Sequence, residues 1–305
     1  MALFRKPAVD EPTEDALLDD IGRRMLKRRV DALKSLPTFP ESVLRLNRLL
    51  SEDGAKESLQ KIAGVIETDP VLCARILRLV NSAFYGVSGA IITVFDALLM
   101  LGLDVVKGLV VSTTVSDMFS GRGSALDGLW EHSYGCAIAA GALGRTLGMS
   151  RCEELSAAAL MHDLGKMVLA SQLTDEYRAV VAQAVADGRT IRETEAKMLG
   201  VTHDEIGHWL VLRWKLPVAI AEPIARHHEP MKAGKYADTA SVVHVADLMI
   251  RGYGFGFAGD RIMPMLDEGA WRHLSLNPDK LRTAVRRMQD DLHAAMNHVN
   301  TLQTT

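Results

Sequence analysis

The sequence predicts an all-helical protein. Apolar residues recur at helical spacing through most of its 305 residues, and no alternation of period two bounded by hairpin turns occurs. Histidines and aspartates lie inside or beside several of these apolar segments. Because facing helices build metal sites from inward-pointing side chains, these residues are expected to meet inside a helical bundle.

The first helix is expected from about residue 13 to residue 35, where five basic residues cluster. Its flanks are acidic and no aromatic residue is interleaved, so this cluster is interpreted as a solvated face and not as a nucleic-acid site. The prolines of LPTFP at 36–40 break the chain, and a new helix follows from Glu41. Asp69 and Pro70 have the spacing of an N-cap and a first helical residue.

The longest apolar stretch, from Val94 to Val115, approaches the length of a membrane span. Charged residues such as Asp104 and Lys107 interrupt it, which predicts buried helices and no membrane anchor. The small and polar segment 120–128 separates two helical patterns and marks a boundary. We therefore predict an N-terminal extension at 1–35, a helical lobe at 36–122 and a second helical domain at 123–305.

The helices predicted in the second domain cover residues 129–147, 153–170 (one helix or a pair), 175–187, 190–198, 218–228, 237–251 and 278–300. Thr202 and Glu205 have the spacing of a capping box, which places His203 at the start of a further helix. The segment GYGFGFAGD at 252–260 lacks the strand and lysine of a phosphate-binding loop, so it is interpreted as a flexible connection.

Composition narrows the function classes. A net charge of -3 and a pI near 6.4 give no overall field for collecting nucleic acid or anionic lipid. The three cysteines, Cys73, Cys136 and Cys152, are far apart without CxxC spacing, which suggests neither a disulfide framework nor a thiolate zinc knuckle. The N-terminus has no apolar segment of signal-peptide length. We predict a cytoplasmic protein without nucleic-acid or membrane partners.

The stretch AAALMHDLGKMVLA at 157–170 places His162 and Asp163 side by side among apolar residues. A buried carboxylate needs a partner or a metal to offset its desolvation. Taken alone, Asp163 would be a helix cap and His162 a hydrogen-bonded core histidine. Further residues of the same types accompany them along the chain: His132, His203, His227, His228 and Asp247. Imidazole with carboxylate favours zinc, iron, manganese, nickel or copper over calcium.

The order His132, His162 with Asp163, then Asp247 resembles the HD superfamily of helical metal-dependent phosphohydrolases. His203, the pair His227 and His228, and Lys166 are similar to the larger ligand set of its HD-GYP branch. The resemblance implies up to two divalent transition metal ions (Fe, Mn, Zn or Ni), with Asp163 bridging them. The triplet GYP is missing after the histidine pair, so specific hydrolysis of cyclic di-GMP is not expected. Gly128 stands where three-metal members have a carboxylate.

Other stretches resemble the HDOD family, in which an HD-like domain is coupled to an N-terminal helical bundle in bacterial signalling. They are LPTFPESVLRLNRLL from Leu36, ETDPVLCARILRLVNSAFYG from Glu67, the LGL at 101–103, and WKLPVAIAEPIARHHEP from Trp214. The resemblance covers roughly residues 36–230. It implies a regulatory protein, although many members have lost the metal ligands that this chain retains.

Three functions stay open. The chain is a signalling module with a metal-loaded HD site, an active phosphohydrolase of nucleotides or cyclic nucleotides, or a metal-free interaction scaffold. In the second, Asp163 and Lys166 are the catalytic residues, with Lys166 contacting phosphate; alternatively, Lys166 simply pairs with Asp163 in a metal-free site. The expected partners are signalling proteins of unknown identity and a nucleotide or phosphoester ligand.

Overall fold

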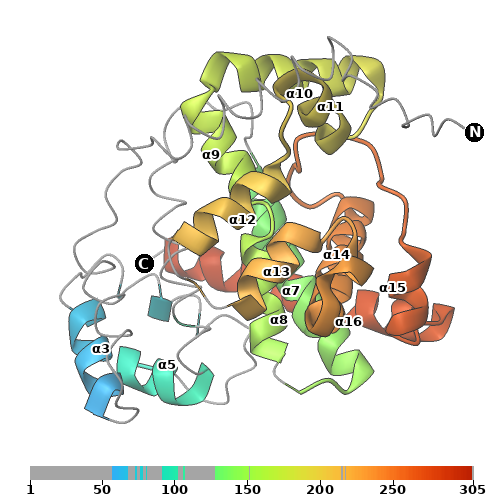
Figure 1. Ribbon diagram of the computed structural model, residues 1–305. Helices are drawn as coiled ribbons and strands as arrows, with labels where there is room; N and C mark the ends of the chain where they lie inside the picture. The colour runs from blue at the N-terminus through green and yellow to red at the C-terminus, as the bar shows by residue number, and fades with distance from the viewer. Residues whose placement is uncertain are drawn as a thin grey trace, which may run out of the picture.

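The computed structural model describes residues 57–67, 73, 76–77, 80, 91–101, 106, 128–150, 152–213, 216 and 218–303. Every regular element within these ranges is a helix, and no strand occurs among them (Figure 1). The all-helical prediction is confirmed for this part of the chain. The helix expected at 13–35, the LPTFP segment and most of the boundary segment 120–128 lie outside the described residues. No described helix is long and apolar enough to cross a membrane.

The described part of the N-terminal region contains two helices, α3 (Glu57–Glu67) and α5 (Val94–Leu101). They pack against each other and bury apolar side chains, among them Ile62, Ile66 and Leu98. The long apolar stretch predicted from Val94 is therefore helical in its first eight residues.

The remaining helices form one bundle (Figure 1). They are α7 (Leu129–Leu147), α8 (Cys152–Met161), α9 (Leu164–Gln172), α10 (Thr174–Asp187), α11 (Ile191–Leu199), α12 (His203–Arg213), α13 (Val218–Arg226), the 3₁₀ helix η2 (Pro230–Tyr236), α14 (Ala237–Tyr253), α15 (Glu268–His273) and α16 (Pro278–Gln303). The segment predicted as one helix or a pair is a pair, because the chain turns at His162 and Asp163 between α8 and α9.

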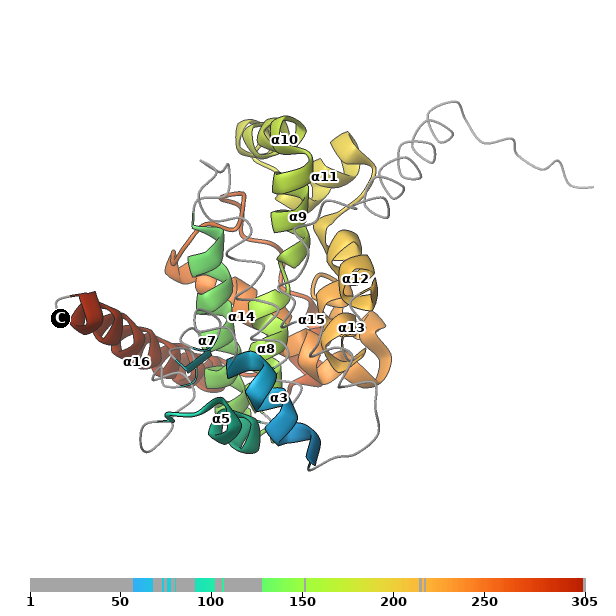
Figure 2. The same cartoon turned by 90° about the vertical axis from the view of Figure 1, so that its left-hand side faces the viewer.

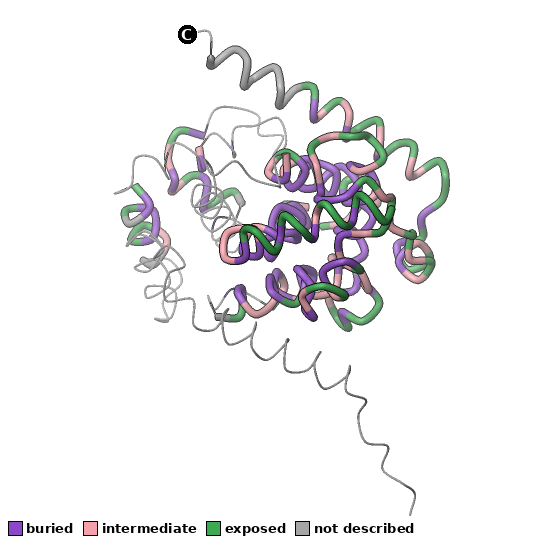
Figure 3. Tube along the Cα trace, turned by 90° about the horizontal axis from the view of Figure 1, so that it is seen from above, coloured by how far each residue is buried: buried purple, intermediate pink, exposed green. Residues whose placement is uncertain are grey.

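Helix α7 is the centre of this bundle and packs against α8, α14 and α16 (Figure 2). Most of its residues from Gly135 to Gly144 are small and buried. Short side chains let neighbouring helix axes approach closely, which concentrates the core around α7. In Figure 3 the buried parts of the trace gather in the middle of the bundle.

Helices α9 and α12 also lie in close contact. Gly165 makes this possible, since a Cβ atom at that position would lie 1.9 Å from the carbonyl oxygen of His203 and 2.8 Å from the backbone nitrogen of Gly207. The contact brings the start of α12 beside the turn that carries His162 and Asp163. The fold therefore places His203 next to this pair through backbone packing.

Candidate metal centre

The sequence-predicted site residues come from five parts of the bundle and meet in its interior. His132 lies in the first turn of α7, and Asp247 lies on α14. His162 and Asp163 form the turn between α8 and α9, and His203 begins α12. His227 and His228 directly follow α13. Asp163 is the N-cap residue of α9, but its side chain makes no capping hydrogen bond, so its carboxylate is available to the cluster.

Asp163 lies at the middle of this cluster. Its Oδ2 atom is 3.3 Å from Nε2 of His162 and 3.6 Å from Nε2 of His132. Its other oxygen, Oδ1, is 3.4 Å from Nε2 of His203 and 4.0 Å from Nε2 of His227. The two carboxylate oxygens therefore face different pairs of imidazoles.

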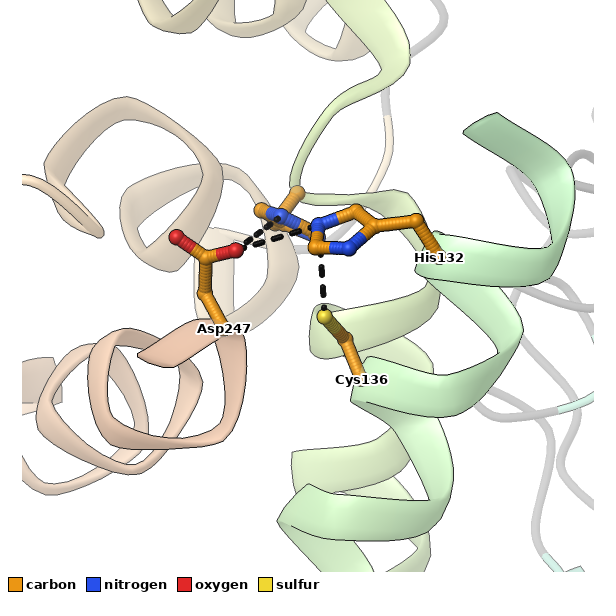
Figure 4. Close-up of side chains that lie close together, drawn as sticks. His132, Cys136 and Asp247 are labelled. Atoms are coloured by element: carbon orange, nitrogen blue, oxygen red, sulfur yellow. Dashed lines mark hydrogen bonds and ion pairs between the residues drawn. The ribbon is translucent and has the colours of Figure 1, made fainter. Parts of the chain in front are cut away.

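One group of donor atoms lies on the Oδ2 side. Nε2 of His132 is 3.0 Å from Oδ1 of Asp247 and 3.5 Å from Sγ of Cys136 (Figure 4). The donor atoms of His132, Cys136, His162 and Asp247 all lie within 4.8 Å of one another. A second group consists of His203, His227 and His228, whose donor atoms are equally close. The Nε2 atoms of His203 and His228 are 3.0 Å apart.

Three buried atoms in this cluster have no hydrogen-bond partner: Nε2 of His162, Oδ1 of Asp163 and Nε2 of His227. The Nδ1 atoms of His162 and His227 lie 2.7 and 2.8 Å from the backbone oxygens of Ala159 and Ile224. A backbone oxygen accepts a hydrogen bond, so each Nδ1 is protonated, and in the neutral ring, the form that ligates a metal, each Nε2 carries the lone pair. Buried acceptors without donors are costly, and a metal cation would satisfy them. The residues present therefore fit a divalent metal.

Electrostatics hold most of these imidazoles neutral, as metal ligation requires. Burial lowers the pKa of His132, although its hydrogen bond with Asp247 opposes the shift. Burial, together with repulsion from His162 and His203, lowers the pKa of His227 to about 3. Burial and the neighbouring His227 likewise lower the pKa of His228. His162 differs. Burial, the largest single effect, lowers its pKa, but the charge and hydrogen bond of Asp163 together with the charge of Asp247 outweigh burial and raise the pKa.

Two buried cations hold the carboxylates ionised. Nζ of Lys166 donates to Oδ2 of Asp163 at 2.6 Å and to the carbonyl oxygen of Ala258 at 2.9 Å. Nε of Arg251 donates to both oxygens of Asp247, at 2.9 and 3.1 Å. Burial alone would raise the pKa of each aspartate, but His162 and Lys166 lower that of Asp163, and Arg251 lowers that of Asp247. The pairing of Lys166 with Asp163, left open by the sequence, is the contact present here.

Sequence reasoning missed several residues that fix the ligands. Glu195 on α11 accepts from the backbone nitrogen of His203 at 2.8 Å, and its Oε2 lies 2.6 Å from Nδ1 of that histidine. Tyr177 on α10 donates to the other oxygen of Glu195 at 2.6 Å. Local spacing gives no signal for these contacts, because they join separate helices. Arg251 does have a signal, because it lies four residues after Asp247 on the same helix.

Cys136 was also missed, although it lies four residues after His132 and so on the same face of α7. The three cysteines lack the CxxC spacing that marks thiolate metal sites in a sequence, so the pattern gave no signal for Cys136. Burial raises the pKa of the Cys136 thiol well above its usual value, so it is protonated when no metal is present.

The segment 252–260 differs from the flexible connection that we predicted, because it packs onto the site. Gly256 has a positive φ of 73° and lies against the start of α7, where a Cβ atom would be 2.2 Å from the backbone nitrogen of His132. The segment lines a cavity of about 500 Å³ that also reaches His132, Arg251 and Arg261. Gly256 is required for this close approach, which the comparison with phosphate-binding loops does not reveal.

His244 holds the backbone behind the site. It lies on α14, three residues before Asp247. Its Nδ1 lies 2.8 Å from the carbonyl oxygen of His227, and its Nε2 accepts from the backbone nitrogen of Asp267 at 2.9 Å. It therefore positions the segment that carries His227.

Comparison with known proteins decides the family. The HDOD domain family matches residues 36–230. The chain belongs to the HDOD family. A crystal structure of an HDOD domain protein of unknown function from Geobacter sulfurreducens is 27% identical, with a TM-score of 0.63 and 88% of each chain covered. A Marinobacter aquaeolei protein, provisionally described as a signal transduction protein, is 21% identical with a TM-score of 0.66, over 91% of this chain and 65% of that one, and shows the same fold.

A curated relative, an uncharacterised protein of Treponema pallidum, is 25% identical over 223 residues. The match covers 72% of this chain but 43% of the relative. This chain therefore corresponds to less than half of that longer protein.

Proposed function

We propose that this HDOD protein is a bacterial signalling module whose HD-like domain binds two divalent transition metal ions. The observation that carries the proposal is the convergence of three buried acceptor atoms without partners, Nε2 of His162, Oδ1 of Asp163 and Nε2 of His227. Each is an acceptor in the interior, and each faces the same cluster. A metal-free core would leave all three unsatisfied at a cost of about 1–3 kcal/mol each.

The arrangement around Asp163 supports two ions instead of one. Oδ2 faces His132 and His162, whereas Oδ1 faces His203 and His227. A bridging carboxylate with its own imidazoles on each side is a pattern suited to a dinuclear centre. In this proposal Asp247 completes the first ligand group and His228 the second.

The balance of buried charges also supports metal binding. Asp163, Asp247, Glu195 and Asp260 are buried carboxylates in or beside the cluster, and Lys166 and Arg251 are the cations that contact them. Among these residues the formal negative charges outnumber the positive ones by two. Uncompensated buried charge is expensive, so the cluster favours added positive charge.

A sensing role is favoured over turnover because both cations are already engaged. Lys166 donates to Asp163 and a carbonyl, and Arg251 donates to Asp247 and Asp260, so neither is directed at a phosphate. Membership of the HDOD family also supports a regulatory role. We propose that the lobe at 36–122 passes a signal from the domain at 123–305 to protein partners.

A second function, phosphohydrolase activity, is favoured by the cavity. It reaches His132 at the edge of the cluster, and the exposed Arg261 lines it, so a nucleotide or other phosphoester has a path to the site. When bound, divalent metals acidify a coordinated water and offset charge on phosphate oxygens. In this function Asp163 holds the metals, and Lys166 orients Asp163 or, if released, contacts the phosphate.

The test is metal analysis of protein purified without a chelating column. Native protein is compared with Asp163→Asn, which keeps an acceptor for Lys166, with His162→Ala as a second variant, and with Asp187→Asn as an exposed control on α10. Metal content near two ions per chain is expected for the native protein and the control, with loss in both site variants. Hydrolysis of phosphoesters by the loaded protein would favour the second function.

A folded native protein that stays metal-free after incubation with iron, manganese, zinc or nickel would overturn both metal functions. The metal-free interaction scaffold would then be the remaining explanation. Circular dichroism of each variant separates loss of metal from loss of fold.

A further inference from the structure

Cys136 places a sulfur atom at the edge of the cluster, and neither proposed function gives this residue a role. It lies on α7 one turn after His132, and it is fully buried. Its Sγ atom is 3.5 Å from Nε2 of His132, and Figure 4 shows both side chains on the same face of α7, with Asp247 approaching from α14. Cys136 therefore shares the space between these two helices with two of the proposed metal ligands.

The distances suit four donors around one ion, to which the shared Oδ2 of Asp163 adds a fifth. Sγ of Cys136, Nε2 of His132, a carboxylate oxygen of Asp247 and a ring nitrogen of His162 all lie within 4.8 Å of one another. Ligands of a tetrahedral zinc ion, with Zn–N near 2.0 Å and Zn–S near 2.3 Å, are roughly 3.3–3.7 Å apart. The S–N separation of 3.5 Å already falls in this range, and small side-chain rotations would bring in the rest.

An independent observation points to a ligand at the same place. Nε2 of His162 is buried and has no hydrogen-bond partner. Its ring is held by the contact of Nδ1 with Ala159, which leaves the Nε2 lone pair directed into the cluster. The nearest acidic oxygens, on Asp163 at 3.3 Å and Asp247 at 4.0 Å, are acceptors themselves and cannot satisfy it when ionised.

We propose that Cys136 is a thiolate ligand of the metal ion held by His132, His162 and Asp247. On binding, the S–H bond is replaced by a metal–sulfur bond, and the proton is released to solvent. The inference rests on the metal-binding function proposed above and adds a thiolate ligand to one of the two proposed metal sites. The two metal sites, which share Asp163, would then differ in their other ligands. One would include the sulfur of Cys136, whereas the other would have only the imidazoles of His203, His227 and His228.

The consequence is metal selectivity. Thiolate is a soft ligand that favours zinc, iron or cobalt over the harder manganese and magnesium. The site with Cys136 should therefore retain zinc in competition with manganese more strongly than the site of His203, His227 and His228, which has no thiolate.

Cobalt(II) titration tests this directly, because cobalt reports its own ligands by absorption. Visible d–d bands show that cobalt is bound, and a near-ultraviolet charge-transfer band shows that sulfur is bound to it. Metal-free native protein is titrated beside Cys136→Ser, which is nearly isosteric. Cys152→Ser is the matched control, since Cys152 is partly buried on α8 and its thiol donates to the backbone of Met149.

The native protein and Cys152→Ser should show both kinds of band, and Cys136→Ser should keep the visible bands but lose the charge-transfer band. Zinc affinity of Cys136→Ser, measured by competition with a chromophoric chelator, should fall on the order of tenfold or more. Visible bands without a charge-transfer band in native protein, or a band that survives in Cys136→Ser, would overturn the thiolate ligand alone. No visible bands in folded native protein would overturn the metal site as well.

Discussion

Replacing Arg251 by methionine should destabilise the metal-free protein strongly. Its guanidinium donates to both oxygens of Asp247, to Oδ1 of Asp260 at 2.8 Å and to the carbonyl oxygen of Ile262 at 3.2 Å. Its side chain is 7% exposed, and those of the two aspartates are 5% and 1% exposed. Methionine has a similar length but cannot donate, so two buried carboxylates would lose their cation.

Breaking one buried ion pair typically costs about 3–5 kcal/mol, because the remaining charge stays desolvated. With two carboxylates affected, Arg251→Met should reach the upper part of this range. Bound metal would compensate Asp247, so the same substitution should cost less in metal-loaded protein. Urea denaturation followed by circular dichroism, with and without a chelator, measures both free energies of unfolding.

Arg272→Met is the matched control. Arg272 also pairs with a carboxylate four residues away, Glu268 at 3.1 Å, but its side chain is 72% exposed. An exposed pair contributes about 0–1 kcal/mol, so this variant should be nearly neutral. If the free energy of unfolding of Arg251→Met, measured with the chelator present, were less than about 1 kcal/mol below that of the native protein, the inferred desolvation of Asp247 and Asp260 would be wrong.

Three other perturbations test neighbouring features. Gly165→Ala should cost about 3 kcal/mol or more, since its Cβ would lie 1.9 Å from the His203 carbonyl oxygen. Gly64→Ala on α3 meets no atom within 4 Å and should stabilise slightly, by about 0.5–1 kcal/mol, in the same urea assay. Glu195→Gln should weaken zinc binding about 10–100-fold by loosening His203, and unchanged affinity in a chelator competition would contradict this positioning role. The pKa of His227 is about 3 in the folded protein, against the ordinary histidine value of 6.5 that applies to the unfolded chain. Between these values the unfolded chain binds the extra proton, so acidification should lower stability by up to about 1.4 kcal/mol per pH unit from this residue. Urea denaturation of metal-free protein at successive pH values checks the sign, and a stability that rises on acidification would refute it.

Sequence alone determined the helical class and the family. The helices around the site begin and end close to where periodicity, capping residues and turns predicted, because these signals are local. His203 does begin α12, as the spacing of Thr202 and Glu205 indicated. The ligand-type residues were recognised by their order along the chain, and that order does not depend on the distance between them in space.

Only the tertiary structure decided which atoms meet. It placed the two oxygens of Asp163 toward different imidazole pairs, engaged Lys166 and Arg251 with the carboxylates, and folded the glycine-rich segment 252–260 against α7. It also brought Glu195 to His203 and Cys136 to the edge of the cluster. The contacts of Asp163 with His132 and His203, and those of segment 252–260 with α7, depend on helix packing between segments far apart in the chain. Lys166, Arg251 and Cys136, in contrast, contact residues three or four positions away. Hydrophobic periodicity shows which face of a helix is buried but not which residues it will meet there.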